Sequence, residues 1–112
     1  MLFRSAFIEA SAQWVPYMMR EARNRLLAKG VRTGDDILRA NNFYVTTQKS
    51  DDLPWLLSEV GDDIFVIGTD YGHADTSSQI EALRLLKEGA SVDRNTIDAI
   101  LDRNARALYG LN

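Results

Sequence analysis

Three side chains that could do chemistry lie close together in the segment "IFVIGTDYGHADTSS", residues 64–78. Asp70 follows an apolar run by two residues, and His73 and Asp75 come shortly after it. A carboxylate at the end of a buried strand can bind a divalent metal or act as a base with a shifted pKa. The alternative is a loop aspartate that hydrogen-bonds nearby backbone N–H groups. Catalytic zinc sites take three protein ligands from well-separated positions, so three groups on one loop do not predict a self-contained site.

Polar side chains also follow two other predicted strands, residues 5–10 and 42–47. Glu9 comes at the end of the first of these strands, and Gln48 directly follows the second. If the strands are parallel, Glu9 and Asp70 face the same rim of the sheet. The alternative for Glu9 is a carboxylate that orients backbone at the strand end. Three successive strands that each end in a polar side chain favour a functional rim.

Other kinds of chemistry are not indicated. The segment "GTDYG" lacks the spacing of a dinucleotide or P-loop fingerprint. His73 is the only histidine, and the serines lie in cap-like contexts, so no Ser–His–Asp arrangement is predicted. Tyr71 either lines a pocket or covers the rim, and its spacing does not decide between these alternatives.

The elements that must position these residues alternate along the chain. Strands are predicted where β-branched, aromatic or continuous apolar residues cluster, at 5–10, 42–47 and 64–68. Helices are predicted from apolar periodicity and capping residues, at 14–30, 51–60, 78–89 and 91–110, and residues 33–40 can form one or two helical turns. The order β-α-β-α-β-α-α indicates an α/β protein with parallel strands and helical crossovers. Three such strands leave open edges and partly covered faces, so the pattern predicts a part of something larger.

Two capping signals define the middle helices. Asp51 and Asp52 can cap a short helix that carries Pro54 in its first turn. Ser78 and Glu81 form a predicted capping box for the following helix. The apolar run of the third strand is continuous rather than alternating, which predicts burial on both faces.

Length and composition limit the class of protein. The chain has 112 residues, enough for one domain, and its 46% hydrophobic and 26% charged residues are typical of soluble globular proteins. The net charge of −3 provides no electrostatic footprint for nucleic acid. No apolar run reaches the length of a membrane span and no signal peptide is recognisable, so we expect a cytoplasmic protein without a membrane partner. Cysteine is absent, which excludes disulfides and thiolate metal sites.

Three segments resemble a known family. The segments "FIEASAQWVPYMMREA", "IFVIGTDYGHAD" and "ILDRNARALYGL" are similar to the C-terminal third of the amidohydrolase-related family. That family includes metal-dependent hydrolases and decarboxylases, the aminocarboxymuconate semialdehyde decarboxylase type among them. The resemblance covers nearly the whole chain and implies a (β/α)8 TIM barrel with its site at the C-terminal ends of the strands. Residues 1–112 would be the C-terminal segment of that barrel, with strands six to eight and their flanking helices, incomplete on its own.

The resemblance also implies roles for single residues. Asp70 matches the family's aspartate at the end of the last strand, which binds the metal, expected to be Zn²⁺, or handles the proton of the attacking water. Glu9 lies where many members place a histidine, and Gly72 stands where a proline is common. The resemblance places Glu9, Tyr71 and His73 on the substrate side of the site.

Other parts of the family's metal site have no counterpart in this sequence. The His-x-His of strand one and the histidine of strand five are missing, and Asp70 alone cannot build a site of four or five ligands. The divalent metal therefore belongs to the complete enzyme, and we expect the isolated chain to be inactive. One hypothesis is a segment of an enzyme that hydrolyses or non-oxidatively decarboxylates a small carboxylate-bearing substrate. The other is a truncated, non-catalytic homologue that self-associates through its open strand edges or binds a partner chain.

Overall fold

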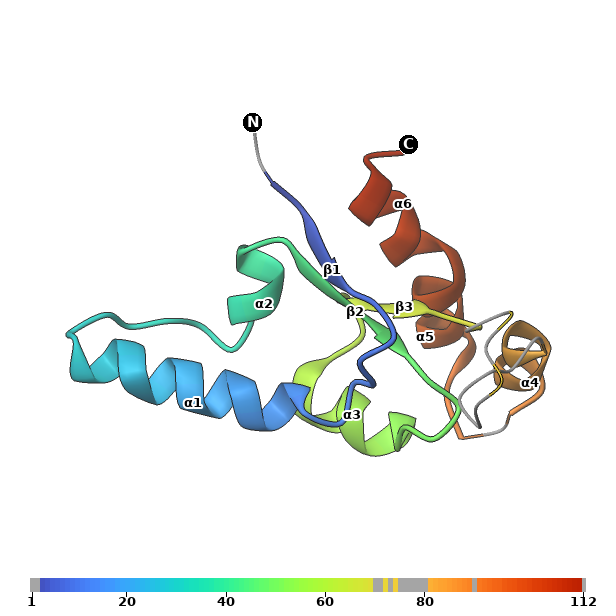
Figure 1. The fold of residues 1–112 in the computed structure, drawn as a ribbon, viewed down its shortest axis with the longest axis horizontal. Coiled ribbons are helices and arrows are strands. Elements are labelled where there is room, and N and C mark those ends of the chain that lie inside the picture. Colours follow the sequence, from blue (N-terminus) through green and yellow to red (C-terminus); the bar gives the residue numbers. More distant parts are fainter. Residues whose placement is uncertain (1–2, 70–71, 73, 75–80, 90, 112) are drawn as a thin grey trace.

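The computed structural model describes residues 3–69, 72, 74, 81–89 and 91–111. At its centre lies a sheet of three strands in the order β1 (Ser5–Phe7), β2 (Phe43–Thr47) and β3 (Phe65–Ile67) (Figure 1). Both strand pairs are parallel, and the register places Phe7 beside Val45 and Val45 beside Phe65. The alternation of strands and helices along the chain therefore predicted the correct topology.

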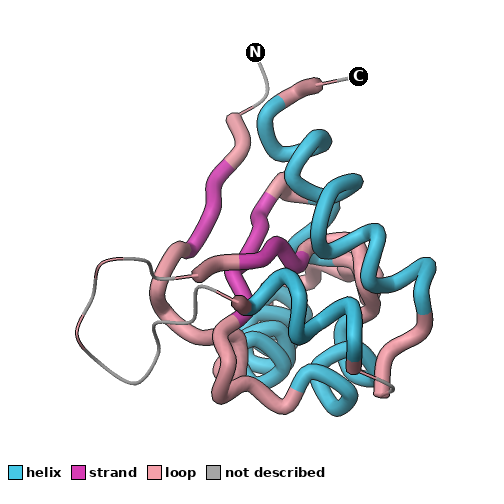
Figure 2. Tube along the Cα trace, turned by 90° about the vertical axis from the view of Figure 1, so that its right-hand side faces the viewer, coloured by secondary structure: helices cyan, strands magenta, loops and turns pink. Residues whose placement is uncertain are grey.

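Helices connect and flank the strands. They are α1 (Val15–Ala28), α2 (Ile37–Ala40), α3 (Leu53–Val60), α4 (Ala82–Glu88), α5 (Arg94–Asp98), the π-helical segment η1 (Ala99–Arg103) and α6 (Asn104–Tyr109). The last three form one continuous helical run, which packs against β3 through η1 and reaches the start of β1 at its C-terminal end, where Gly110 lies beside Arg4 (Figure 2). None of the helices in the described part of the chain is long and apolar enough to cross a membrane.

The hydrophobic core lies on one face of the sheet. Side chains alternate between the two faces of a strand, so Val45 and Phe65 point to the same side. There they pack with Val15 of α1, Leu56 of α3 and Ile100 of η1, and all five side chains are fully buried. Each buried side chain of this size stabilises the fold by about 1.5–3 kcal/mol. This cluster therefore holds the sheet to three helical segments that are far apart in the sequence.

The strands differ in how well they are covered. Phe65 and Val66 are both buried, as the continuous apolar run of β3 predicts, whereas Ser5 and Phe7 of β1 are exposed. β1 also ends at Phe7, before the predicted end at residue 10. The reason is that Glu9 has a φ of 61°, a left-handed backbone conformation that cannot continue an extended strand.

Local signals position several helix ends correctly. The Asp52 carboxylate accepts the Trp55 N–H at 3.2 Å, and Pro54 lies in the first turn of α3. Gly110 ends α6 with a φ of 70°, a value that glycine adopts without a steric penalty. Ser78 of the predicted capping box lies outside the described residues.

The last helix is less regular than its apolar spacing predicts. Its middle segment, η1, is a π-helix, which adds one residue to the turn of an α-helix. Directly after it, the buried Asn104 donates from Nδ2 to the carbonyl oxygens of Asp62 at 2.5 Å and Phe65 at 2.7 Å. Because the Val45 N–H pairs with the Ile64 carbonyl, the Phe65 carbonyl faces the outer edge of β3. Asn104 therefore covers part of a sheet edge that the sequence predicts to be open.

Candidate functional site

The C-terminal ends of the three strands meet at a pocket of about 280 Å³, which we call the rim pocket. Glu9 and Gln48, from the loops after β1 and β2, line it together with Thr69, which follows β3. Val66 belongs to the face of the sheet opposite the core, and Leu108 of α6 also contributes to the lining. The structure thus brings together Glu9 and Gln48, the two strand-end groups that the sequence places at a common rim.

The other predicted site residues lie outside the described residues. These are Asp70, Tyr71 and His73, together with Asp75. Their roles therefore stay predictions. Glu9 and Gln48 are the predicted rim residues that the structure describes, and the Glu9 side chain is exposed at the rim pocket.

Glu9 is held in place through its backbone. Its φ of 61° and the φ of 59° at Ser11 are left-handed values that residues other than glycine rarely adopt. The Glu9 N–H donates to Thr46 Oγ1 at 3.1 Å, and that hydroxyl donates to the Phe7 carbonyl at 3.3 Å. Such backbone conformations cost roughly 1–3 kcal/mol each and persist only where surrounding contacts determine them. The loop after β1 is therefore a specifically shaped feature of this end of the sheet.

Asp51 joins the loops after β1 and β2. One of its carboxylate oxygens accepts the Ser11 hydroxyl, and the other accepts the Ala12 N–H at 3.1 Å and the Gln48 N–H at 2.7 Å. The sequence suggests Asp51 and Asp52 as caps of α3, but the side-chain cap bond comes from Asp52. Sequence reasoning missed the role of Asp51. The signal in the sequence that could have indicated this role is the second carboxylate of the pair Asp51 and Asp52, because α3 needs only one capping residue.

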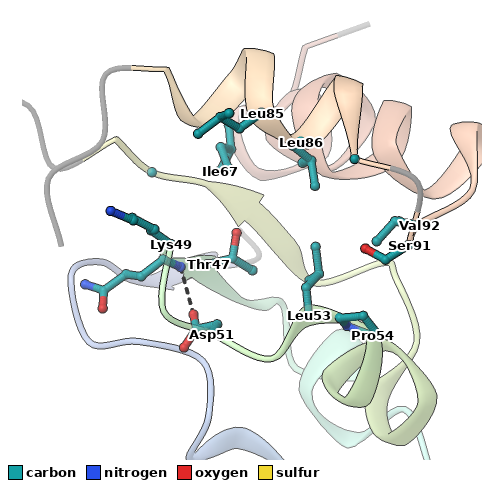
Figure 3. Close-up of a pocket in the computed structure, with 13 residues that line it drawn as sticks. Thr47, Lys49, Asp51, Leu53, Pro54, Ile67, Leu85, Leu86, Ser91 and Val92 are labelled. Atoms are coloured by element: carbon teal, nitrogen blue, oxygen red, sulfur yellow. Dashed lines mark hydrogen bonds between the residues drawn. The ribbon is translucent and has the colours of Figure 1, made fainter. Parts of the chain in front are cut away.

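A second pocket, of about 300 Å³, lies between the sheet and helices α3 and α4 (Figure 3). Leu53 and Pro54 approach it from α3, and Leu85 and Leu86 approach it from α4. Its lining is mostly apolar, like that of the rim pocket, and also includes Gln48, Lys49 and Asp51. The rim pocket, unlike this one, is lined by polar side chains that follow all three strands, so it is the candidate site.

The described side chains do not fit a divalent metal by themselves. Among them there is no group of three His, Cys, Asp or Glu side chains that could hold such an ion. Both oxygens of the Asp51 carboxylate already accept hydrogen bonds. A metal at the rim would need Asp70, which the structure does not describe, or groups from other strands.

Comparison with known proteins defines the fold. No family model and no curated protein matches the chain. Among solved structures, it is similar to an amidohydrolase from Mycobacterium avium subsp. paratuberculosis, with a TM-score of 0.73 and 23% sequence identity. The similarity covers 95% of this chain and 28% of the amidohydrolase, so the chain spans less than a third of that protein. Its three parallel strands and their helices form an open sheet with the fold of one part of an amidohydrolase barrel.

Proposed function

We propose that residues 1–112 form the C-terminal segment of a metal-dependent amidohydrolase-type barrel and provide one part of its active site. The observation that carries this proposal is the convergence of Glu9 and Gln48 at the rim pocket, in a sheet that matches part of an amidohydrolase. Barrels of parallel strands carry their active sites at this end of the strands. The remaining strands would supply the remaining groups of the site.

In the complete barrel, Asp70 is the proposed catalytic residue and metal ligand. Glu9, Tyr71 and His73 would contact the substrate, a small molecule that carries a carboxylate. A divalent metal, expected to be Zn²⁺, supplies Lewis-acid polarisation of the substrate or of a water molecule when it is bound. Hydrolysis and non-oxidative decarboxylation are both compatible with this assignment. The isolated chain, which lacks the histidines of the other strands, would be inactive.

The rim pocket limits where the substrate carboxylate can bind. Glu9 contributes a negative charge, and no Lys, Arg or His occurs among the described residues that line this pocket. A carboxylate placed beside Glu9 would be repelled, because like charges at close range in a partly buried site are unfavourable. The cation that binds the substrate carboxylate would therefore come from beyond this described lining: from Lys49 in the adjoining pocket, from another strand of the barrel, or from a residue that the structure does not describe.

A hybrid barrel tests this proposal. The chain would replace the segment that it matches in the mycobacterial amidohydrolase, and bound zinc would be measured together with thermal unfolding. We expect the hybrid to bind roughly one zinc ion per chain. Asp70→Asn should weaken zinc binding by at least about tenfold, because it removes a ligand.

Asp98→Asn provides the matched control, because Asp98 is an exposed carboxylate on α5. This substitution should leave zinc binding unchanged. A folded hybrid that holds zinc equally well with Asp70→Asn would contradict the role proposed for Asp70.

A second candidate function, self-association, is favoured by the exposure of β1. Among the described elements, β2 is the only one with which β1 packs extensively. Because the Ser5 N–H pairs with the Asn42 carbonyl, the main-chain groups of Ala6 face away from β2. Phe3 and Ile8, which flank this strand, are 78% and 62% exposed. An open edge beside exposed apolar side chains favours addition of a strand from a second copy of the chain.

Light scattering with two charge substitutions tests this second function. Ile8→Lys introduces a charge beside β1, and Leu27→Lys introduces the same charge at a comparably exposed position on α1. If the second function holds, the parent chain and Leu27→Lys should form dimers or larger assemblies, whereas Ile8→Lys should be monomeric. A parent chain that stays monomeric at every concentration would rule it out.

A further inference from the structure

We propose that Asp51 is a positioning residue that locks the loop after β1 to the loop after β2, so that Glu9 and Gln48 face the rim pocket as one unit. The two groups leave different strands, but the Asp51 carboxylate accepts hydrogen bonds from both loops. Only the identification of the rim pocket as an active site rests on the proposed function. The mechanical coupling of the two loops stands on the contacts themselves.

The loop after β1 needs such a partner. Glu9 and Ser11 both have left-handed φ values, and a flexible loop would relax toward negative φ. Asp51 satisfies the Ser11 hydroxyl and the Ala12 N–H. Two further hydrogen bonds join this loop to the segment around β2: the Glu9 N–H donates to Thr46 Oγ1, and the Asp52 N–H donates to the side chain of Gln13. The Asp51 carboxylate is thus one side chain that bonds to both loops, with two bonds to the first and one to the second.

The chemistry of the carboxylate is matched to this role. One oxygen, Oδ2, accepts an N–H from each loop, from Ala12 at 3.1 Å and from Gln48 at 2.7 Å. An ionised carboxylate has only acceptor sites, whereas an asparagine amide has one acceptor oxygen and an NH₂ donor. In Asp51→Asn the NH₂ group would face either the Ser11 hydroxyl or the two N–H groups. The substitution keeps the shape of the side chain and removes part of the bridge.

Helix capping alone does not explain Asp51. Its neighbour Asp52 accepts the Trp55 N–H and so caps α3. The side-chain bonds of Asp51 instead reach Gln48, on its own loop, and residues 39 and 40 positions earlier in the chain. Asp52 therefore has a local role at the start of α3, whereas Asp51 has a long-range role between the two loops. A substitution of Asp52 is the matched control for the same substitution of Asp51.

Amide hydrogen exchange and backbone NMR of the 112-residue chain test the proposal. With Asp51→Asn, the amides of Ala12 and Gln48 should both exchange at least about tenfold faster, because both lose a charge-assisted acceptor. The Val45 amide, which pairs with the Ile64 carbonyl in the core of the sheet, should keep its protection. With Asp52→Asn, the exchange rates of Ala12 and Gln48 should stay at the parent values.

The proton shifts of the Ala12 and Gln48 amides provide a second readout. Both N–H groups bind the same oxygen, Asp51 Oδ2, so both shifts should change together in Asp51→Asn and stay at the parent values in Asp52→Asn. A change at only one of the two amides would overturn the proposal. So would unchanged exchange in Asp51→Asn, or an equal rise in exchange that includes Val45.

These results are independent of the zinc measurement on the hybrid barrel. If the hybrid fails to respond to Asp70→Asn while the two amides remain coupled, the proposed function is wrong and the coupling by Asp51 stands. If the hybrid responds while only one of the two amides changes in Asp51→Asn, the site assignment stands and Asp51 has no positioning role.

Discussion

Asp51 and Asn104 each join backbone segments that are far apart in the sequence. The Asp51 bond to Ser11 spans 40 residues, and the Asn104 bond to Phe65 spans 39. Local spacing cannot predict such pairs, because they depend on the register of the strands and on the turn of the last helix. The sequence nevertheless marks both regions, since Asp51 is one of the two predicted caps of α3 and Asn104 lies in a segment that resembles a known family.

Asn104 supports a prediction about stability. Asn104→Ala leaves two carbonyl groups, those of Asp62 and Phe65, without this donor in a buried position. A buried polar group that loses its hydrogen-bond partner costs about 1–3 kcal/mol. We therefore expect the free energy of unfolding in urea to fall by roughly that amount for each of the two carbonyl groups that gains no hydrogen bond from water. Asn95→Ala on the exposed side of α5 is the control and should have a much smaller effect. Equal effects of the two substitutions would contradict the role of Asn104.

At the scale of the elements, sequence patterns located most strands and helices but not their irregular ends. β2 and β3 were predicted because β-branched and apolar residues cluster there, and α1 because its apolar residues recur at helical spacing. β1 stops early because of the backbone at Glu9, which its residue type does not reveal. The π-helix was missed because the spacing of apolar residues in the last helix fits a regular α-helix about as well as it fits a helix with a π-helical segment. The candidate site shows the same division, since strand-end placement predicted Glu9 and Gln48 but not Asp51.

The start of α5 supports a prediction about pH. The Asp93 carboxylate accepts the Thr96 N–H at 3.0 Å and the Thr96 hydroxyl at 2.9 Å. These bonds, first the N–H and then the hydroxyl, lower the pKa of Asp93 below its usual value. A carboxyl group with a lowered pKa in the folded state stabilises the fold above its unfolded pKa, and this stabilisation is lost as the pH falls through the folded pKa. Asp93→Ala should therefore destabilise the chain more at neutral pH than in acid below the folded pKa.

Urea unfolding at the two pH values checks this prediction. Asp98→Ala, on the same helix, controls for removal of a carboxylate. If Asp93→Ala causes the same loss of stability at both pH values, the cap does not depend on the ionised carboxylate.

At the scale of the whole molecule, the chain is an open sheet with its helices arranged unevenly around it. It measures 45 × 30 × 28 Å, and α1 extends along the longest direction, away from α5 and α6 (Figure 1). The sequence predicted an incomplete barrel from three short segments, and the match to 28% of an amidohydrolase agrees with that prediction. The sequence did not predict that α6 would contribute Leu108 and Tyr109 to the rim pocket. That contact depends on how the last helix crosses the sheet.

The central claim is that this chain provides only part of a metal site, with Asp70 as its proposed ligand. The most direct test is the zinc content of the purified 112-residue chain after dialysis against zinc and removal of weakly bound ions, with Asp70→Asn measured in parallel. We expect both proteins to retain far less than about one zinc ion per chain, because catalytic zinc sites need about three protein ligands. About one zinc ion per monomer of the parent chain, lost in Asp70→Asn, would show a complete site within these residues and would contradict the account.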